Sequence, residues 1–292
     1  MLKKWKVLTI LIALCAISFA VYEAYQRQFK LENIRLDSAE SKLPVNSDEL
    51  KLLQDVLSQP YTYLDRGKQS FVFLSQDQRY VLKFFDTRNL RPRYFSSEVR
   101  RSYKRKIARL ITGYRTAFDH DRDHSGLLYV QLQPNPEVKL VVDLIDRFGF
   151  QHKINLGKVP FIVQQRAIPT RHLITAMLEK GNTAEAIQFL RKMIDMYMDE
   201  YQRGLFDRDH NFMHNTGFID GQPVRIDQGR LKVDESFKDP RIFMPDLRKI
   251  TIDRTGGWLS RHFPQYREEI LSAMQTKLDE ISFSEKVRSI PN

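Results

Sequence analysis

The stretch that decides the fold is GLFDRDHNFMHN, residues 204–215, which is followed after a short interval by RIDQGR at residues 225–230. The first part is polar and rich in carboxylates, which predicts a compact loop. Between the two parts, residues 216–219 and 223–226 are short apolar runs on either side of Asp220-Gly221, a pair typical of a tight hairpin turn. The chain is therefore predicted to pass from a loop directly into a small hairpin.

A long amphipathic helix is predicted immediately before this loop, from about residue 183 to Gly204. Its apolar side chains recur every three or four positions and so share one face: Ile187, Leu190, Ile194, Tyr197 and Tyr201. Gly204 is a typical helix end, because glycine adopts the left-handed conformation that closes the last turn. After the hairpin, the chain is predicted to be mostly helical to about residue 287.

The first half of the chain carries strand patterns instead. Short runs of β-branched and aromatic residues predict strands at 61–64, 70–74, 80–85, 138–146 and 159–166. A single amphipathic helix interrupts them from about Ser97 to Phe118. This order predicts an α+β protein in which a small strand-rich lobe precedes a larger helical lobe.

Three of these segments resemble motifs of the protein-kinase-like superfamily. LDRGKQSFVF, residues 64–73, resembles its glycine-rich loop, with Gly67 retained and with Asp65 and Ser70 in place of the other two glycines. YVLKFF, residues 80–85, resembles the strand whose lysine holds the nucleotide phosphates.

The third motif is the stretch quoted first. It resembles the catalytic loop and the D-F-G segment of that superfamily in three pieces: Asp-Arg-Asp at residues 207–209, Asn215, and Asp-Gln-Gly at residues 227–229. Asp207 stands where the family has His, and the interval from Asp209 to Asn215 is one residue longer than usual.

The resemblance implies a role for each matching residue. Asp209 would be the catalytic base, with Asp207 as the alternative, and Lys83 would pair with Glu98 on the following helix. The residues implied for binding ATP are Gly67, Ser70, Lys83 and Gln165, and those implied for Mg²⁺ are Asn215 and Asp227.

The fold implied by the resemblance is bilobal, with a small antiparallel-sheet lobe at residues 59–167 and a helical lobe at 168–292. No A-P-E motif follows Gly229, which favours compact kinases of small molecules, lipids or lipopolysaccharide sugars over protein kinases. The expected activity is phosphoryl transfer from ATP to a hydroxyl of a small molecule, lipid or glycan. The alternative is a membrane-anchored pseudokinase that serves as a binding or scaffold module.

Charge is distributed unevenly along the 292 residues, whose formal net charge is +11. Residues 79–109 hold eleven Lys and Arg against two acids, and three lysines precede residue 7, so the remainder is close to neutral. The basic helix is open to three interpretations: a solvated helix face, a surface for anionic lipid or lipopolysaccharide, or a nucleic-acid surface. No nucleic-acid-binding module accompanies it, which makes nucleic acid the least favoured partner.

The amino terminus predicts a membrane segment. Residues 7–22 carry no charge, and lysines precede them. Residues 1–22 are therefore either an uncleaved signal anchor or a signal peptide cut after Ala20, followed by a stalk or lead-in helix at 23–58. The basic residues before the span place the N-terminus in the cytoplasm and the folded domain on the non-cytoplasmic side. The single cysteine, Cys15, excludes an intramolecular disulfide and a CxxC site.

Two further patterns carry weaker signals for a metal. Residues 119–125 alternate acids like a calcium loop, but they lack its glycine, and we expect a solvated loop. His210 and His214 are four apart without the glutamate of a zinc-protease motif, so a zinc site is not expected.

Overall fold

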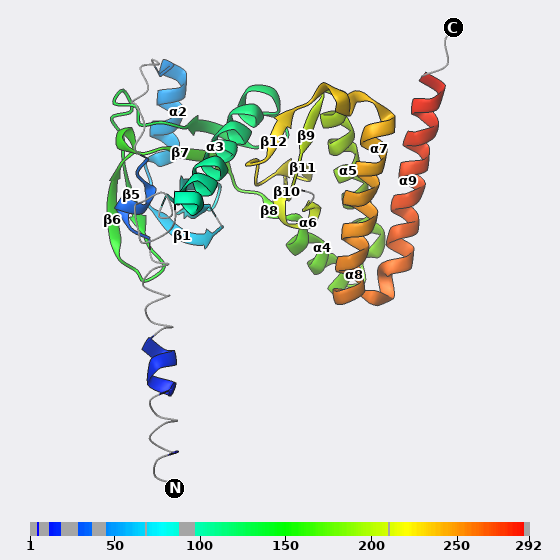
Figure 1. The fold of residues 1–292 in the computed structure, drawn as a ribbon, viewed down its shortest axis with the longest axis horizontal. Coiled ribbons are helices and arrows are strands. Elements are labelled where there is room, and N and C mark those ends of the chain that lie inside the picture. Colours follow the sequence, from blue (N-terminus) through cyan, green and yellow to red (C-terminus); the bar gives the residue numbers. More distant parts are fainter. Residues whose placement is uncertain are drawn as a thin grey trace. The chain divides into compact units, whose positions relative to one another are not determined.

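The computed structural model describes Trp5 and residues 12–18, 29–36, 45–67, 69–87, 97–209 and 211–288, the side chains of 97, 99, 100 and 286–288 excepted. Figure 1 shows the elements along the chain. The chain divides into two compact units. Unit 1 comprises Met1–Gln76, Lys83–Arg88 and Gln133–Pro160, and unit 2 comprises Asp77–Leu82, Asn89–Leu132 and Phe161–Asn292. Helices and strands are mixed in the fold, which confirms the α+β class.

Unit 1 is built on strands in the order β3-β2-β1-β5-β6. They are β1 (Tyr61–Arg66), β2 (Ser70–Ser75), the Lys83–Phe85 part of β3 (Tyr80–Phe85), β5 (Val141–Ile145) and β6 (Gln151–Asn155). The described part of unit 1 also contains the helices η1 (Leu31–Ile34), α2 (Ser47–Leu57) and η3 (Leu156–Lys158), in addition to a helical stretch at residues 12–18. The predicted strands at the start of the motif region are thus confirmed.

One strand pair departs from the expected antiparallel sheet. β1 pairs antiparallel with β2, but it pairs in parallel with β5, with Tyr61 opposite Leu144. A parallel neighbour needs a long connection, and about 75 residues separate β1 from β5 in the sequence, against three between β1 and β2. The prediction of a purely antiparallel sheet is wrong at this position.

Phe29 lies in the core of unit 1, although it belongs to the segment expected to form a stalk. It is fully buried, and its ring lies 5.3 Å from Phe71 and 5.0 Å from Phe73, measured between centroids. The backbone is tied down a few residues later, because Thr87 donates from its N–H and its hydroxyl to the carbonyl of Asn33 at 2.7 and 2.9 Å. Residues 29–34 are therefore part of the globular unit.

Unit 2 begins with a helix and two strands: α3 (Ser97–His120), β4 (Leu127–Gln131) and β7 (Phe161–Gln165), the strands pairing antiparallel. The Tyr80–Leu82 part of β3 lies beside β7. The chain then forms β8 (Ile168–Pro169), α4 (Thr170–Glu179), α5 (Thr183–Gln202), β9 (Leu205–Asp207), α6 (Phe212–Asn215), β10 (Thr216–Ile219), β11 (Gln222–Arg225) and β12 (Leu231–Val233). It ends in η4 (Glu235–Lys238), α7 (Pro240–Arg248), η5 (Lys249–Arg254), α8 (Thr255–His262), η6 (Pro264–Tyr266) and α9 (Arg267–Arg288).

The long helix α5 supplies the centre of the unit 2 core. Leu190, Ile194, Tyr197 and Tyr201 are buried, as their spacing predicts, and Ile187 is half-buried. Side chains of α7, α8 and α9 belong to the same core, among them Phe243, Leu259 and Met274. The helix therefore connects this core to β9, the strand that follows it directly in the chain.

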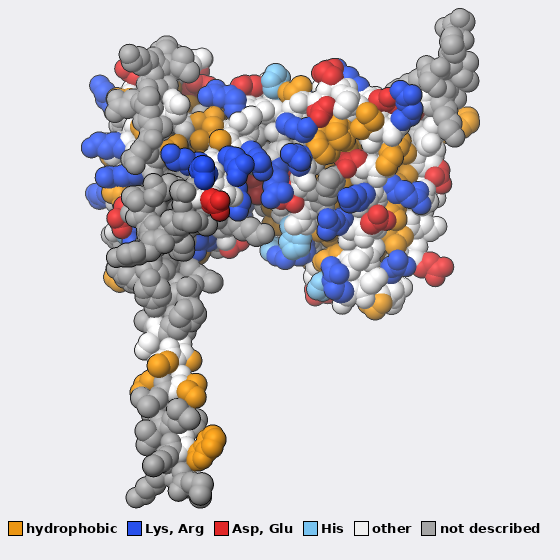
Figure 2. Space-filling view, viewed as in Figure 1, with side chains coloured by type: hydrophobic (Ala, Val, Ile, Leu, Met, Phe, Trp, Pro, Cys, Tyr) orange, Lys and Arg blue, Asp and Glu red, His pale blue; other side chains and the backbone are white. Residues whose placement is uncertain are grey.

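The basic helix α3 is amphipathic. Tyr103, Ile107, Leu110 and Tyr114 form its buried face, whereas its lysines and arginines between residues 101 and 115 are exposed. Figure 2 shows Lys and Arg side chains gathered over this helix. The buried face packs on β4 and β12 within unit 2.

The predicted membrane segment, residues 7–22, lies outside the described residues except for 12–18, which are helical and exposed. Within the described ranges, none of the helices combines the length and the hydropathy that a membrane crossing requires.

Candidate active site

The loop that resembles a catalytic loop is held between β9 and α6. β9 pairs antiparallel with β12, with Leu231 opposite Asp207, so the loop leaves from a fixed strand end. The short helix α6 leads directly into β10, and β10 pairs along its whole length with β11, Thr216 opposite Arg225. All of these elements belong to unit 2.

Asn215 and Asp227 meet at the open end of this hairpin. The carbonyl oxygen of Asn215 accepts hydrogen bonds from the N–H groups of Ile226 and Asp227, at 2.8 and 3.2 Å. Asp227 is exposed, and its Oδ1 accepts a hydrogen bond from the N–H of Gly229 at 3.0 Å. The two residues predicted to hold Mg²⁺ are thus brought side by side by local strand pairing.

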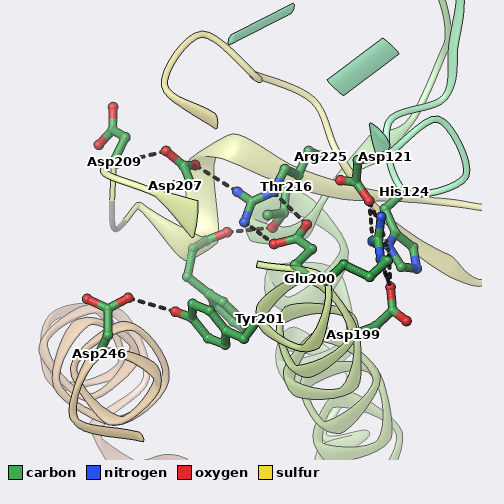
Figure 3. A network of polar contacts seen from close by, with 12 residues as sticks. Asp121, His124, Asp199, Glu200, Tyr201, Asp207, Asp209, Thr216, Arg225 and Asp246 are labelled. Atoms are coloured by element: carbon green, nitrogen blue, oxygen red, sulfur yellow. Dashed lines mark hydrogen bonds and ion pairs between the residues drawn. The ribbon is translucent and has the colours of Figure 1, made fainter. Parts of the chain in front are cut away.

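Arg225, the last residue of β11, lies at the centre of a buried ion-pair network (Figure 3). It is fully buried; its Nε donates to Glu200 Oε1 at 2.7 Å, its Nη2 donates to Glu200 Oε2, and its Nη1 donates to Asp207 Oδ2 at 2.7 Å. Its guanidinium also lies over the ring of Tyr197, 4.7 Å from the centroid. Such bidentate pairing satisfies a buried guanidinium and orients both carboxylates.

Asp207 and Asp209 occupy different environments, although they are two residues apart. Asp207 is buried; its Oδ1 accepts from the N–H of Asp209 at 2.8 Å, and its Oδ2 accepts from Arg225. Asp209 is half-exposed, and its Oδ2 lies 3.6 Å from Arg230 Nε. Asp207 therefore has both oxygens engaged and holds the backbone of Asp209 in place.

Burial sets the pKa values around this network. Desolvation raises the pKa of Asp207, and Arg225 opposes that rise. Burial likewise raises the pKa of Glu200 above its usual range against the pull of Arg225. The phenol of Tyr114, on the buried face of α3, has its pKa raised by burial and then by the negative charge of Asp227. Tyr114 on α3 therefore lies close enough to Asp227 for that carboxylate to affect the pKa of its phenol.

Two buried glutamines fasten the segment after the hairpin. Gln228 stands where the resemblance has Phe, and its Nε2 donates to the carbonyls of Ser125 and Arg225 at 3.2 and 2.6 Å. Gln164 on β7 donates to the same two carbonyls at 2.5 and 3.0 Å. Both residues are almost fully buried. Neither glutamine was predicted to position the site, although Gln228 within Asp-Gln-Gly was an available signal.

The remaining predicted residues are distributed over both units. Three of them belong to unit 1: Gly67, Ser70 and Lys83. Gly67 lies between β1 and β2 and donates its N–H to the carbonyl of Ser70 at 2.9 Å, and Lys83 is buried on β3. Glu98 in the first turn of α3 and Gln165 at the end of β7 are exposed and belong to unit 2. The pairing of Lys83 with Glu98 stays a prediction.

Asp121, His124 and Glu200 form a second polar cluster, with potential ligand atoms within 4.8 Å of one another. Two guanidinium groups already neutralise it: Arg203 Nη2 lies 2.5 Å from Asp121 Oδ1, and Arg225 engages both oxygens of Glu200. The cluster is therefore an ion-pair network. The expectation of a solvated loop at residues 119–125 is wrong for Asp121 and Ser125, which are buried; Asp121 pairs there with Arg203 from the end of α5.

Comparison with known proteins finds no family model that matches the chain and no curated protein that matches it. Solved structures do share similarity. WbdD bound to the kinase inhibitor LY294002 is similar over 74% of this chain and 45% of that chain, at 12% identity and a TM-score of 0.40. A structure described as the bifunctional kinase-methyltransferase WbdD covers 72% and 43%, at 13% identity and a TM-score of 0.35.

The complex of Rv3197 with erythromycin from Mycobacterium tuberculosis is similar over 80% of this chain and 60% of that chain, at 14% identity and a TM-score of 0.32. The chain thus spans less than two thirds of the length of each of these solved chains. The function proposed below rests on the residues of this chain.

Proposed function

We propose that this protein is a kinase-like phosphotransferase that moves a phosphoryl group from ATP to a hydroxyl of a small molecule, lipid or glycan. The observation that carries the proposal is the junction of Asn215 and Asp227, whose backbones are hydrogen-bonded at the open end of the β10–β11 hairpin. This junction joins the backbones of two residues whose side chains carry an amide oxygen and a carboxylate, next to the loop that contains Asp209.

The donor set at this junction fits Mg²⁺. Mg²⁺ prefers hard oxygen ligands and is held in phosphoryl-transfer sites by one or two protein side chains together with the phosphates of the substrate. Asn215 and Asp227 offer such oxygens, and Asp227 is exposed. Bound Mg²⁺ would neutralise charge on the phosphates during transfer.

We assign the role of the catalytic base to Asp209. Its half-exposed carboxylate is available to accept the proton of the acceptor hydroxyl, whereas Asp207 is occupied by Arg225 and by the backbone of Asp209. This difference supports Asp209 over Asp207 as the base. Lys83 is proposed to hold the nucleotide phosphates, with Gly67 and Ser70 in the loop before it.

A thermal unfolding experiment on the full-length chain tests the proposal. ATP with Mg²⁺ should raise the melting temperature of the wild type, because a ligand that binds only the folded state stabilises it. Asp227→Asn, which keeps an oxygen for the N–H of Gly229 but removes the charge, should abolish the Mg²⁺-dependent part of the shift. Asp220→Asn is the matched control, since Asp220 is an exposed carboxylate at the tip of the same hairpin.

The absence of any shift in the wild type would contradict the proposal and favour the pseudokinase alternative. Anchoring through residues 7–22, with the folded domain on the non-cytoplasmic side, also stays a proposal. It has a separate test: a reporter fused to the C-terminus should give its signal outside the cytoplasm, and a cytoplasmic signal would overturn it.

A further inference from the structure

Three cationic or titratable side chains gather next to the candidate active site: Arg171 and His172 in the first turn of α4, and His214 on α6. We call them the cationic cluster. Arg171 Nη1 lies 3.4 Å from His214 Nδ1, and Arg171 Nη2 lies 3.3 Å from His172 Nε2. All three side chains are exposed. The cluster therefore presents a guanidinium and two imidazoles to solvent.

The cluster is held rigidly beside Asn215. Thr170, the residue before Arg171, shares a hydrogen bond of 2.8 Å with Thr216, the residue after Asn215, and both hydroxyls are fully buried. Because Thr216 donates to the carbonyl of Phe212 at 2.5 Å, Thr170 is the donor in the first bond. The start of α4 is thus bonded to the chain one residue away from a candidate Mg²⁺ ligand.

The charge of Arg171 can be compared with that of other arginines of unit 2. Some of these pair with carboxylates, as Arg191 does with Glu280 at 3.1 Å and Arg241 does with Asp239 at 2.6 Å. Among the described residues, no carboxylate lies within ion-pair distance of Arg171, whose side-chain contacts are the two imidazoles. A guanidinium and two imidazoles held together, with no acid beside Arg171 among the described residues, form a surface that suits an anion.

We propose that the cationic cluster binds a phosphate group of the acceptor molecule, so that the substrate is a phosphorylated small molecule, lipid or glycan. This inference rests on the proposed function, because it assigns the cluster to the acceptor of that reaction. A guanidinium matches the geometry of phosphate through two parallel N–H donors, and the imidazoles add further donors. Placement beside Asn215 would bring the acceptor hydroxyl to Asp209 and the transferring phosphate.

Two molecules could supply the phosphate group that binds the cluster, the acceptor and the nucleotide. Calorimetry on the 292-residue chain distinguishes between them. Inorganic phosphate and Mg²⁺–ATP are titrated separately into the wild type, Arg171→Gln and Arg261→Gln. Arg261 is the matched control, an exposed arginine on α8. We expect Arg171→Gln to weaken phosphate binding at least about tenfold, because a pair of charge-assisted hydrogen bonds is lost. Mg²⁺–ATP binding should stay unchanged.

His172→Gln should weaken phosphate binding in the same direction, and Arg261→Gln should bind phosphate like the wild type. Equal phosphate affinity in Arg171→Gln and wild type would overturn the proposal. So would a parallel loss of Mg²⁺–ATP affinity, because it would assign the cluster to the nucleotide. Failure of the proposed function shows separately, as a wild type that does not bind Mg²⁺–ATP whatever its phosphate affinity.

Discussion

Asp207 and Asp209 are two positions apart, yet their surroundings give them different chemistry. Asp207 is buried and receives two hydrogen bonds from Arg225 and from the backbone of Asp209, whereas Asp209 is half-exposed. A carboxylate whose oxygens are both engaged positions its neighbours, and one that faces solvent can accept a proton from a substrate. The kinase-like motif marks both residues, but only the contacts of Arg225 distinguish them.

The variants Asp209→Asn and Asp207→Asn should therefore differ in kind. Asp209→Asn should change stability by less than about 0.5 kcal/mol, because the side chain is half-exposed, and lower ATP turnover by about 10²-fold or more. Turnover is measured as ADP released by transfer to water, next to Mg²⁺–ATP binding, which should persist. A folded Asp207→Asn protein that loses turnover while Asp209→Asn keeps it would reverse the assignment.

Arg225 is the residue on which the stability of the site depends most. Replacing it by Met leaves Glu200 and Asp207 buried without a cation, and breaking a buried pair in this way typically costs about 3–5 kcal/mol. Urea unfolding followed by the fluorescence of Trp258, which is buried in unit 2, measures the loss. The control is Arg191→Met, which breaks the exposed pair with Glu280 and should cost at most about 1 kcal/mol. Similar losses in both variants would contradict the prediction.

At the scale of elements, Gly113 allows α3 to touch the Asp-Gln-Gly segment. A Cβ at this position would lie 2.2 Å from the carbonyl oxygen of Gln228 and 2.7 Å from the backbone carbon of Gly229. Both are backbone atoms, so no side-chain rotation can relieve the overlap. The absence of a side chain at Gly113 thus sets the distance between the basic helix and the loop that carries Asp227.

Gly113→Ala should destabilise the protein by about 1–3 kcal/mol through overpacking. In a free helix the same change would stabilise by about 0.5–1 kcal/mol, so the sign alone is decisive. The melting temperature and the affinity for Mg²⁺–ATP should both fall, because the segment after Asp227 must move. Thr112→Ala, at an exposed position of the same helix, is the control; a stabilised Gly113→Ala protein would show that the contact is absent in solution.

At the scale of the whole molecule, the buried charges of unit 2 give stability a pH dependence. The hydrogen bond that the His124 ring makes to the carboxylate of Asp121 raises the pKa of His124 above 6.5, and burial raises the pKa of Glu200. His124 also faces Asp199 at 3.5 Å and Arg203 Nη2 at 3.1 Å. Between the unfolded and folded pKa values of each group, the folded protein holds a proton that the unfolded chain has released.

Stability should therefore fall as pH rises from about 4.5 to about 7 for Glu200 and above about 6.5 for His124, by at most about 1.4 kcal/mol per pH unit for each group. Circular dichroism melts across this range measure it. His124→Gln should flatten the upper part of the curve, and His262→Gln, an exposed histidine on α8, should leave it unchanged. A wild-type melting temperature that rises with pH over this interval would contradict the signs of both shifts.

Local patterns were sufficient for much of the fold. The spacing of apolar residues predicts α5 and α3, and Asp220-Gly221 between two short runs predicts the β10–β11 hairpin. The strands β4 and β6 were not predicted: β6, QHKIN, is polar, and both strands lie at the edges of the sheet. The parallel pairing of β1 with β5 carries no local signal, because it depends on where a distant segment returns.

The sequence alone was enough to predict most of the elements, the hairpin and the proximity of Asn215 and Asp227, because those contacts arise between residues close along the chain. The burial of Asp121, the convergence of Gln164 and Gln228 on the carbonyl of Ser125, and the contact of Arg171 with His214 became known only from the folded structure. Each of these contacts joins segments about 40 to 100 residues apart. Burial and pairing at that range follow from how the core of unit 2 packs, and periodicity and motif spacing do not encode them.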